Sequence, residues 1–131
     1  MKLFSQNPVG LSGKVSRTVD ATMTASAVGS GGVDVLSTPT MILLMEMAAV
    51  EAVSGALARG LVTVGTGVNV RHLAATPMGD TVTAAAEVTA LEGRRLTFAV
   101  EARDSERIVG TGTHVRMAVD LQRFMSSLRE P

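Results

Sequence analysis

The sequence has no cysteine, tryptophan or tyrosine, and its large aromatic side chains are limited to three phenylalanines. Without cysteine the chain can form neither a disulfide nor a thiolate metal site. With aromatics at 2%, it also lacks the stacking side chains that bind single-stranded nucleic acid. Its 12 basic residues balance 12 acidic ones, so no net charge draws it toward nucleic acid or an anionic membrane. We therefore expect no nucleic-acid partner.

The sequence also gives no support for a membrane or metal protein. Its first residues, MKLFSQNPVGLSG, lack the unbroken apolar run of a signal peptide. The long apolar stretch 39–58 is interrupted by Glu46 and Glu51, and each charge is costly in hydrocarbon. The two histidines, His72 and His114, have no carboxylate three or four residues away, so no metal site is predicted. We expect a cytoplasmic protein without a membrane span, metal or cofactor.

What the chain does contain is enough apolar material for a folded core. Hydrophobic residues make up 46% of its 131 residues, which fits a single domain, 1–131. A glycine-rich loop over 27–37 precedes a predicted helix over 39–59, with Thr38 as its N-cap and Gly60 ending it. A helix with so few charges needs apolar surroundings on most sides, either a wrapped sheet or a sheet plus a second subunit.

Alternating apolar residues predict strands on both sides of this helix. One strand is expected over 14–22, and four more over 61–73, 81–91, 95–103 and 108–119, before a short helix over 120–129. The short turns between the last strands predict sequential antiparallel pairing. The pattern predicts an α+β fold of the hot-dog type, in which a curved antiparallel sheet of about five strands wraps a long central helix. The alternating valines of 61–73, followed by His72, are expected to share one face of the sheet.

Three stretches carry polar groups where a core is expected. Glu46 ends the apolar run STPTMILLME, so it reaches solvent, has a partner, or acts in catalysis. His72 continues an apolar strand face up to a turn, as a hydrogen-bonded rim residue or a catalytic imidazole would. His114 and Arg116 share a strand face with two glycines, a face that cannot fill a core alone. A ligand, another stretch of backbone, or a subunit interface must cover that face.

Four blocks of the sequence, covering about residues 33–125, resemble the hot-dog thioesterases similar to fluoroacetyl-CoA thioesterase. The blocks, in order, are STPTMILLME, GTGVNVRHLAATPMGDTV, EGRRLTFAVEARD and GTGTHVRMAV with the following LQRF. The resemblance implies an acyl-CoA hydrolase whose catalytic residues are Thr38, Glu46 and His72. The loop VGSGGVDVL differs from the specialised fluoroacetyl enzyme, because it lacks the phenylalanine of that enzyme's lid.

The resemblance also implies how the substrate is bound. It places a backbone contact to the thioester at Gly65 and matches Arg116 to an arginine of the family. Leu36 and His114 are further candidates for substrate contact. Arg116 is expected to act through coenzyme A or the subunit interface, and coenzyme A is part of the substrate. The implied assembly is a homodimer, or a dimer of dimers, with its active sites along the interface.

Two other functions use the same kind of cleft. One is a hot-dog hydratase or dehydratase, and the other is a protein that binds acyl-CoA without catalysis. Release of free thiol from simple acyl-CoA substrates distinguishes a thioesterase from both. The sequence leaves open the acyl group, and whether Glu46 or Thr38 acts as the nucleophile or the base.

Overall fold

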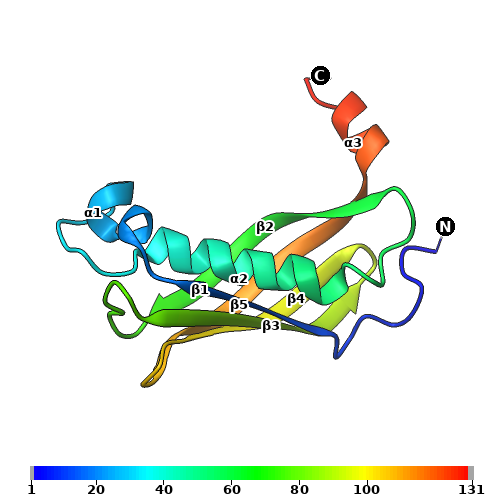
Figure 1. Ribbon diagram of the computed structural model, residues 1–131. Coiled ribbons are helices and arrows are strands. Elements are labelled where there is room, and N and C mark those ends of the chain that lie inside the picture. Colours follow the sequence, from blue (N-terminus) through cyan, green and yellow to red (C-terminus); the bar gives the residue numbers. More distant parts are fainter. Residues whose placement is uncertain (1, 130–131) are drawn as a thin grey trace.

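The computed structural model describes residues 2–129, which form a curved sheet around one long helix (Figure 1). The strands are β1 (Ser12–Thr18), β2 (Leu61–His72), β3 (Thr81–Glu92), β4 (Arg95–Arg103) and β5 (Ile108–Asp120). The helical segments are η1 (Ala21–Met23), α1 (Ala25–Val28), α2 (Thr38–Val53) and α3 (Leu121–Ser126). This confirms the expected α+β arrangement of a long helix wrapped by a five-stranded antiparallel sheet.

The order of the strands in the sheet is β1-β3-β4-β5-β2, and every neighbouring pair is antiparallel. The hairpins β3–β4 and β4–β5 follow from the short turns predicted in the sequence. β1 and β2 are the two edge strands. α2 packs mainly on the side of the concave face formed by β1 and β3, and much less against β2. The part of the concave face beside β2 is therefore only partly covered.

The core lies between α2 and the concave face of the sheet. On β4 the alternation predicted from the sequence is confirmed, because its four inward residues are all buried: Leu96, Phe98, Val100 and Ala102. They pack with the buried side chains of α2, which are Met41, Leu44, Met45, Ala48, Ala49, Ala52 and Val53. Among residues 2–129, no helix is long and apolar enough to span a membrane.

The start of α2 differs from the prediction in a way that matters for function. Ser37, not Thr38, is the N-cap, since its side-chain oxygen accepts a hydrogen bond of 3.1 Å from the backbone N–H of Thr40. Thr38 is the first residue of the helix, and Pro39 follows in the first turn, where its missing N–H costs nothing. The Thr38 hydroxyl is therefore free for another partner.

The end of α2 comes earlier than predicted, at Val53. The backbone of 56–58 bonds instead to the N-terminal segment: Ser5 N–H donates to the Ala56 carbonyl, and Ala58 N–H donates to the Leu3 carbonyl, both at 2.8 Å. A continued helix would need those groups for itself. Gly60 has a positive φ of 84°, as a terminating glycine would, but it lies in the turn that leads into β2.

Two β-bulges change which residues face the core. In β2 the register shifts between Gly65 and Gly67, so Val68 and His72 face inward, whereas Val62 and Val64 lie on the outer face. The prediction that all four valines share a face with His72 was wrong for this reason. A second shift between Val88 and Ala90 in β3 turns Ala90 outward. A bulge adds one residue to one strand, which strict alternation does not anticipate.

Two smaller predictions also need correction. The first strand is Ser12–Thr18 and is followed by η1, so it ends earlier than the predicted 14–22. The expected loop over 27–37 contains the end of α1 and returns to bond with the chain at Thr76, whose carbonyl accepts from the N–H of Leu36 at 2.9 Å.

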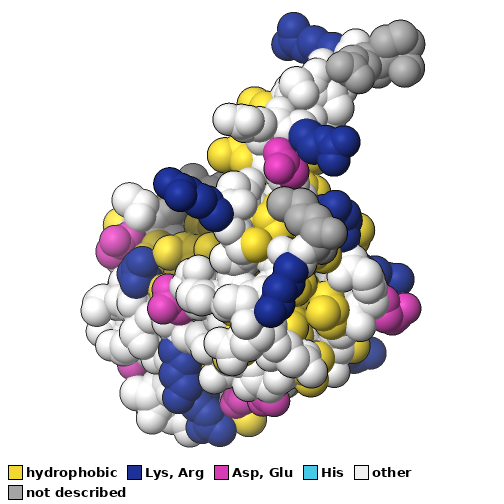
Figure 2. Space-filling view, turned by 90° about the vertical axis from the view of Figure 1, so that its right-hand side faces the viewer, with side chains coloured by type: hydrophobic (Ala, Val, Ile, Leu, Met, Phe, Trp, Pro, Cys, Tyr) yellow, Lys and Arg dark blue, Asp and Glu magenta, His cyan; other side chains and the backbone are white. Residues whose placement is uncertain are grey.

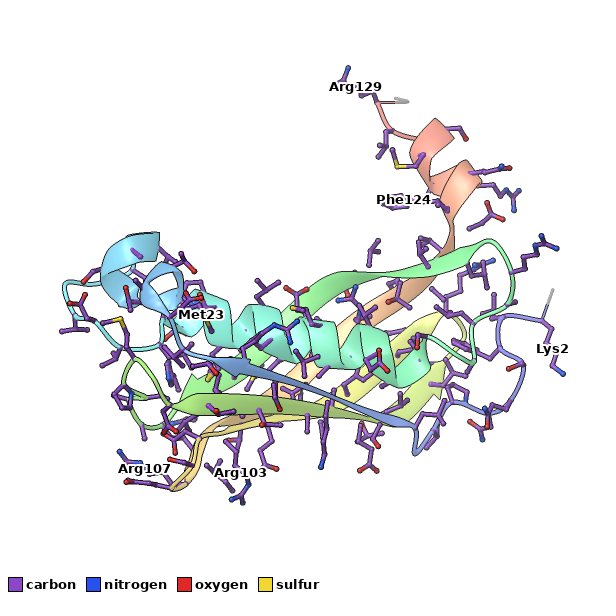
Figure 3. The ribbon with its side chains drawn as sticks, viewed as in Figure 1. Lys2, Met23, Arg103, Arg107, Phe124 and Arg129 are labelled. Carbon is purple, nitrogen blue, oxygen red and sulfur yellow. The ribbon has the colours of Figure 1, made fainter. Side chains whose placement is uncertain are left out.

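The C-terminal helix α3 projects away from the body of the molecule, past the β2 edge of the sheet (Figures 1 and 2). It exposes three large apolar side chains, Leu121, Phe124 and Met125, and Leu128 just after the helix is exposed too. Figure 3 shows Phe124 and Arg129 at this end, far from Arg103 and Arg107 at the β4–β5 hairpin. Met23 in the same view marks the opposite end, where α2 begins.

Candidate active site

Thr38 and His72 form a hydroxyl–imidazole pair where α2 begins and β2 ends. Thr38 Oγ1 lies 2.8 Å from His72 Nδ1. Thr38 is in place because Ser37 caps the helix just before it, and His72 faces inward because the bulge in β2 sets its register. The pair joins two segments that are 34 residues apart in the sequence. The two residues were predicted as site residues, and the structure brings them together.

His72 is half-buried, and its second ring nitrogen, Nε2, is buried without a hydrogen-bond partner in the described residues. Burial lowers the pKa of His72 below 6.5, although the backbone at Ala74 opposes this shift. The ring is therefore neutral at pH 7. A neutral imidazole beside a hydroxyl can accept a proton from it, which is the task of a general base.

A cavity of about 440 Å³ opens at this pair. Thr38 and His72 line one side of it, and the rest of the lining is largely apolar: Ala25, Val33, Val35, Leu36, Ala74 and Ala75. Leu36, predicted as a substrate contact, lies at this cavity with 1% of its surface exposed. The volume is that of a small ligand site, with a few polar groups at one side.

The N-terminus of α2 points at the same cavity, since Ser37 and Thr38 belong to its lining. A helix of 16 residues carries a partial positive charge at its N-terminus. That charge favours an anion forming at the Thr38 end of the cavity. The arrangement therefore offers a nucleophile or donor, a base, and a field that stabilises an oxyanion.

A second polar cluster lies along the middle of α2, around Glu46. Glu46 Oε2 is 3.3 Å from Arg116 Nη1 and 3.9 Å from His114 Nε2. The Glu46 side chain is 38% exposed and borders a separate cavity of about 510 Å³. Arg116 is buried, and its guanidinium also binds Thr63, through Nε to Oγ1 and Nη2 to the backbone carbonyl, both at 2.9 Å. Glu46 thus has both a partner and access to solvent.

Gly65 lies against this carboxylate. A Cβ added at Gly65 would come within 2.7 Å of Glu46 Oε2, 3.2 Å of Arg116 Nη1 and 3.3 Å of His114 Cε1. Only a glycine leaves room for the three side chains to meet the strand here. Gly65, predicted as a backbone contact to the thioester, therefore lies beside Glu46 and at the bulge of β2.

The face of glycines, His114 and Arg116 was expected to need a ligand, another backbone or an interface to cover it. The structure covers the glycine part from within the chain. A Cβ at Gly110 would collide with the Met41 side chain of α2, and one at Gly112 with the backbone of Asn69 and Val70. Among residues 2–129, no three His, Asp or Glu side chains gather as metal ligands would.

Within one chain the predicted catalytic residues thus fall into two groups. Thr38 and His72 form one, and Glu46 lies in the other with Arg116. Eight residues along a helix separate Thr38 from Glu46 by about 12 Å, so one chain does not bring the two side chains into contact. Sequence reasoning missed Ser37 and Thr63. Serine is a favoured N-cap residue, so its position directly before Thr38 in STPT could have indicated the cap, whereas nothing in the local sequence marks Thr63 as a partner of Arg116.

Comparison with known proteins supports one family. Residues 19–122 match the family model described as fluoroacetyl-CoA-specific thioesterase. Fluoroacetyl-CoA thioesterase from Streptantibioticus cattleyicolor is 42% identical over 97 residues, which cover 74% of this chain and 70% of that protein.

Solved structures agree in fold. A structure of the fluoroacetyl-CoA thioesterase superposes with a TM-score of 0.88 at 33% identity, covering 97% of this chain and 100% of the other. A hot-dog-like protein from Thermanaerovibrio acidaminovorans gives a TM-score of 0.81 at 27% identity, covering 95% of each chain. The chain has the hot-dog fold and belongs to the fluoroacetyl-CoA-specific thioesterase family.

Proposed function

We propose that the protein hydrolyses a short or medium acyl-CoA thioester, with the acyl group in the cavity at Thr38 and His72. The observation that carries this proposal is the 2.8 Å contact between the Thr38 hydroxyl and the neutral His72 imidazole. The hydroxyl is not used as a helix cap, and it lies at an apolar cavity beside a helix N-terminus. Family membership supports the same chemistry.

The proposed reaction begins at the thioester carbonyl. Thr38 Oγ1 attacks it, the hydroxyl proton passes to His72 Nδ1, and the sulfur leaves as coenzyme A after taking a proton. The α2 N-terminus of one subunit and a backbone N–H at Gly65 of the other stabilise the oxyanion of the intermediate. Water then cleaves the ester on Thr38, with a carboxylate as the general base for that water. In the alternative reaction, Glu46 directs the water straight at the thioester, and Thr38 donates a hydrogen bond to the carbonyl.

In either reaction the carboxylate comes from the partner subunit of a homodimer. Glu46 and Gly65 adjoin each other in one chain, about 12 Å along α2 from Thr38. A two-fold axis that pairs the β2 strands antiparallel about Val68 and Asn69 sets Gly65 of one strand opposite His72 of the other. The partner's Glu46 then faces the Thr38–His72 pair. Each active site would hold residues of both chains.

Several exposed features support this assembly. β2 is a 12-residue edge strand, and its residues 65–69 are exposed. A long uncovered edge is a template for pairing with another strand. Val68 faces inward yet remains 44% exposed, because α2 leaves this part of the concave face uncovered. Leu43 and Val50, on either side of Glu46, are also exposed, at 53% and 46%.

The first experiment measures thiol release from acyl-CoA substrates of two to twelve carbons. We expect turnover that is fastest for acyl groups small enough for the cavity. Hydration of an enoyl-CoA without thiol release would favour the hydratase alternative, and binding without turnover would favour an acyl-CoA binding protein. The cytoplasm, where the sequence predicts the protein to be, is the compartment proposed for this activity.

The role of Glu46 has a sharper test. Glu46→Gln keeps an oxygen that accepts from Arg116, but the amide is neither a base nor a nucleophile. We expect kcat to fall by about 10²–10⁴-fold with little change in melting temperature, since general base catalysis is typically worth that much. Near-normal kcat in this variant would make Glu46 structural.

Mixing two inactive variants tests whether the site is shared between subunits. A heterodimer of Thr38→Ala and Glu46→Gln keeps one intact site out of two if each site uses both chains. Subunit exchange in an equal mixture should then restore about a quarter of wild-type turnover, because half of the dimers are mixed. No recovery, with subunit exchange shown by mass spectrometry, would mean that both residues act within one chain. A stable monomer in sedimentation at micromolar concentration would exclude the dimer altogether.

A further inference from the structure

His114 lies behind the candidate site. It is on β5 with 1% of its surface exposed, and its ring packs near Phe98, with 6.0 Å between ring centroids. It lines neither the cavity at Thr38 nor the one at Glu46. Both of its ring nitrogens nevertheless have partners: Nδ1 is 2.7 Å from the Gly67 carbonyl oxygen, and Nε2 is 3.1 Å from Arg116 Nη1.

These two partners determine where the ring carries its proton. A carbonyl oxygen only accepts hydrogen bonds, so Nδ1 must carry the hydrogen. A guanidinium only donates, so Nε2 must present its lone pair to Arg116. The ring is therefore the neutral Nδ1–H tautomer. Burial lowers the pKa of His114 and the positive charge of Arg116 adds to this, and together they outweigh the hydrogen bond to Gly67 and the charge of Glu46, which act the other way. The lowered pKa agrees with the neutral form that the two partners require.

Arg116 in turn is held at three points before it reaches Glu46. Thr63 binds Nε and Nη2, and His114 Nε2 accepts from Nη1. A guanidinium is a rigid planar fork, so these contacts fix the direction of Nη1 toward Glu46 Oε2 at 3.3 Å. His114 Nδ1 is hydrogen-bonded to the carbonyl of Gly67, so the same ring also links Arg116 to the β2 bulge beside Gly65.

We propose that His114 is a positioning residue, which holds Arg116 so that the Glu46 carboxylate stays fixed against the β2 bulge at Gly65. It touches no substrate in this role, although the sequence predicted it as a substrate contact. The inference rests on the proposed function of Glu46. A misplaced carboxylate would lower the rate of the chemical step, since an error of 1 Å in geometry can cost about 10²-fold.

Two substitutions test the two hydrogen bonds of the His114 ring separately. His114→Gln places an amide oxygen near the position of Nε2, where it can accept from Arg116. His114→Asn places an amide N–H near the position of Nδ1, where it can donate to Gly67, and it leaves Arg116 without its acceptor. We expect His114→Asn to lower kcat by about 10–100-fold with KM unchanged, and His114→Gln to keep kcat within a few-fold of wild type.

Val100→Ala is the matched control. It removes buried volume from the same concave face but no hydrogen bond to Arg116. We expect it to lower the melting temperature and leave kcat unchanged. If both His114 variants lower the melting temperature and leave kcat unchanged, as the control is expected to, His114 is merely structural and the proposal fails. An increase in KM at constant kcat would make His114 a substrate contact, which also overturns it.

A spectroscopic measurement needs no turnover. In ¹⁵N-histidine-labelled wild-type protein at pH 7, we expect His114 to show a protonated Nδ1 and a lone pair on Nε2. An Nε2–H tautomer, or an imidazolium, would refute the proposal. If the wild type hydrolysed no acyl-CoA, or if Glu46→Gln kept its activity, the proposed function would fail while the tautomer result still reported on the Arg116 contact. The two failures are therefore distinguishable.

Discussion

Gly65→Ala tests whether the position of Glu46 controls the rate. The new Cβ would lie 2.7 Å from Glu46 Oε2, well below the 3.4–4 Å of an ordinary contact, so the carboxylate must move by close to 1 Å. It cannot move freely, because Arg116 Nη1 holds it and would itself lie 3.2 Å from the Cβ. We expect kcat/KM to fall by about 10–100-fold, the cost of a displacement of this size.

The fold should tolerate the same change. The closest contacts are the ends of side chains, not backbone, and Gly65 does not have a positive φ. Replacing such a glycine by alanine restricts the unfolded chain, which offsets part of any strain. We therefore expect an almost unchanged melting temperature, measured by circular dichroism, beside the loss of thiol release. Gly55→Ala is the control, since its Cβ would meet nothing within 4 Å. Wild-type turnover in Gly65→Ala would refute the link between this strand and the carboxylate.

Two further predictions concern the other cluster. Thr38→Ala should lower kcat at least about 100-fold with little loss of stability, whereas Ser37→Ala should cost about 1 kcal/mol of stability as a lost N-cap, measured by urea unfolding; the reverse pattern would make Thr38 structural. The pKa of His72 is lowered below 6.5 by burial, so kcat/KM should be level above that pH and fall as the pH drops through the lowered pKa. This limb should disappear in His72→Gln. Stability should follow the same sign: it is fully present above pH 6.5, where unfolded histidine is neutral, and declines as the pH falls toward the folded pKa.

The sequence predicted the helix and sheet layers of the fold because each layer depends on the local periodicity of apolar residues. The alternation in β4 and the presence of one long apolar helix after residue 37 can be read directly, and both hold in the structure. The end of α2 could not be read this way, since the backbone of 56–58 is taken by residues 3–5, more than 50 positions earlier. The β-bulges next to Gly65 and Ala90 could not be predicted for a related reason, because the register of each strand depends on how it pairs with the neighbouring strand.

The sequence indicates the candidate site residues more readily than the contacts between them. Thr38 was interpreted chiefly as a helix cap. Ser37 is the cap instead, because its backbone is still extended and its side chain accepts from the N–H of Thr40. The resemblance implied Thr38, Glu46 and His72 as one catalytic set along a subunit interface, and in one chain His72 binds Thr38 while Glu46 binds Arg116. Such pairings depend on the directions of side chains on strands that are distant in the sequence. The spacing of residues along one segment gives no information about those directions.

The apolar run that ends at Glu46 can now be explained in physical terms. A buried Arg116 needs a counter-charge, because an isolated cation out of water is costly, and Glu46 supplies it. Its side chain is 38% exposed and borders a cavity, which pairing with Arg116 does not require. Arg116 contacts the Glu46 carboxylate through a single nitrogen, Nη1, and its other hydrogen bonds go to Thr63 and His114. One carboxylate oxygen is thus held while the carboxylate keeps access to solvent. That geometry suits a carboxylate that must stay fixed while a water or a thioester approaches it.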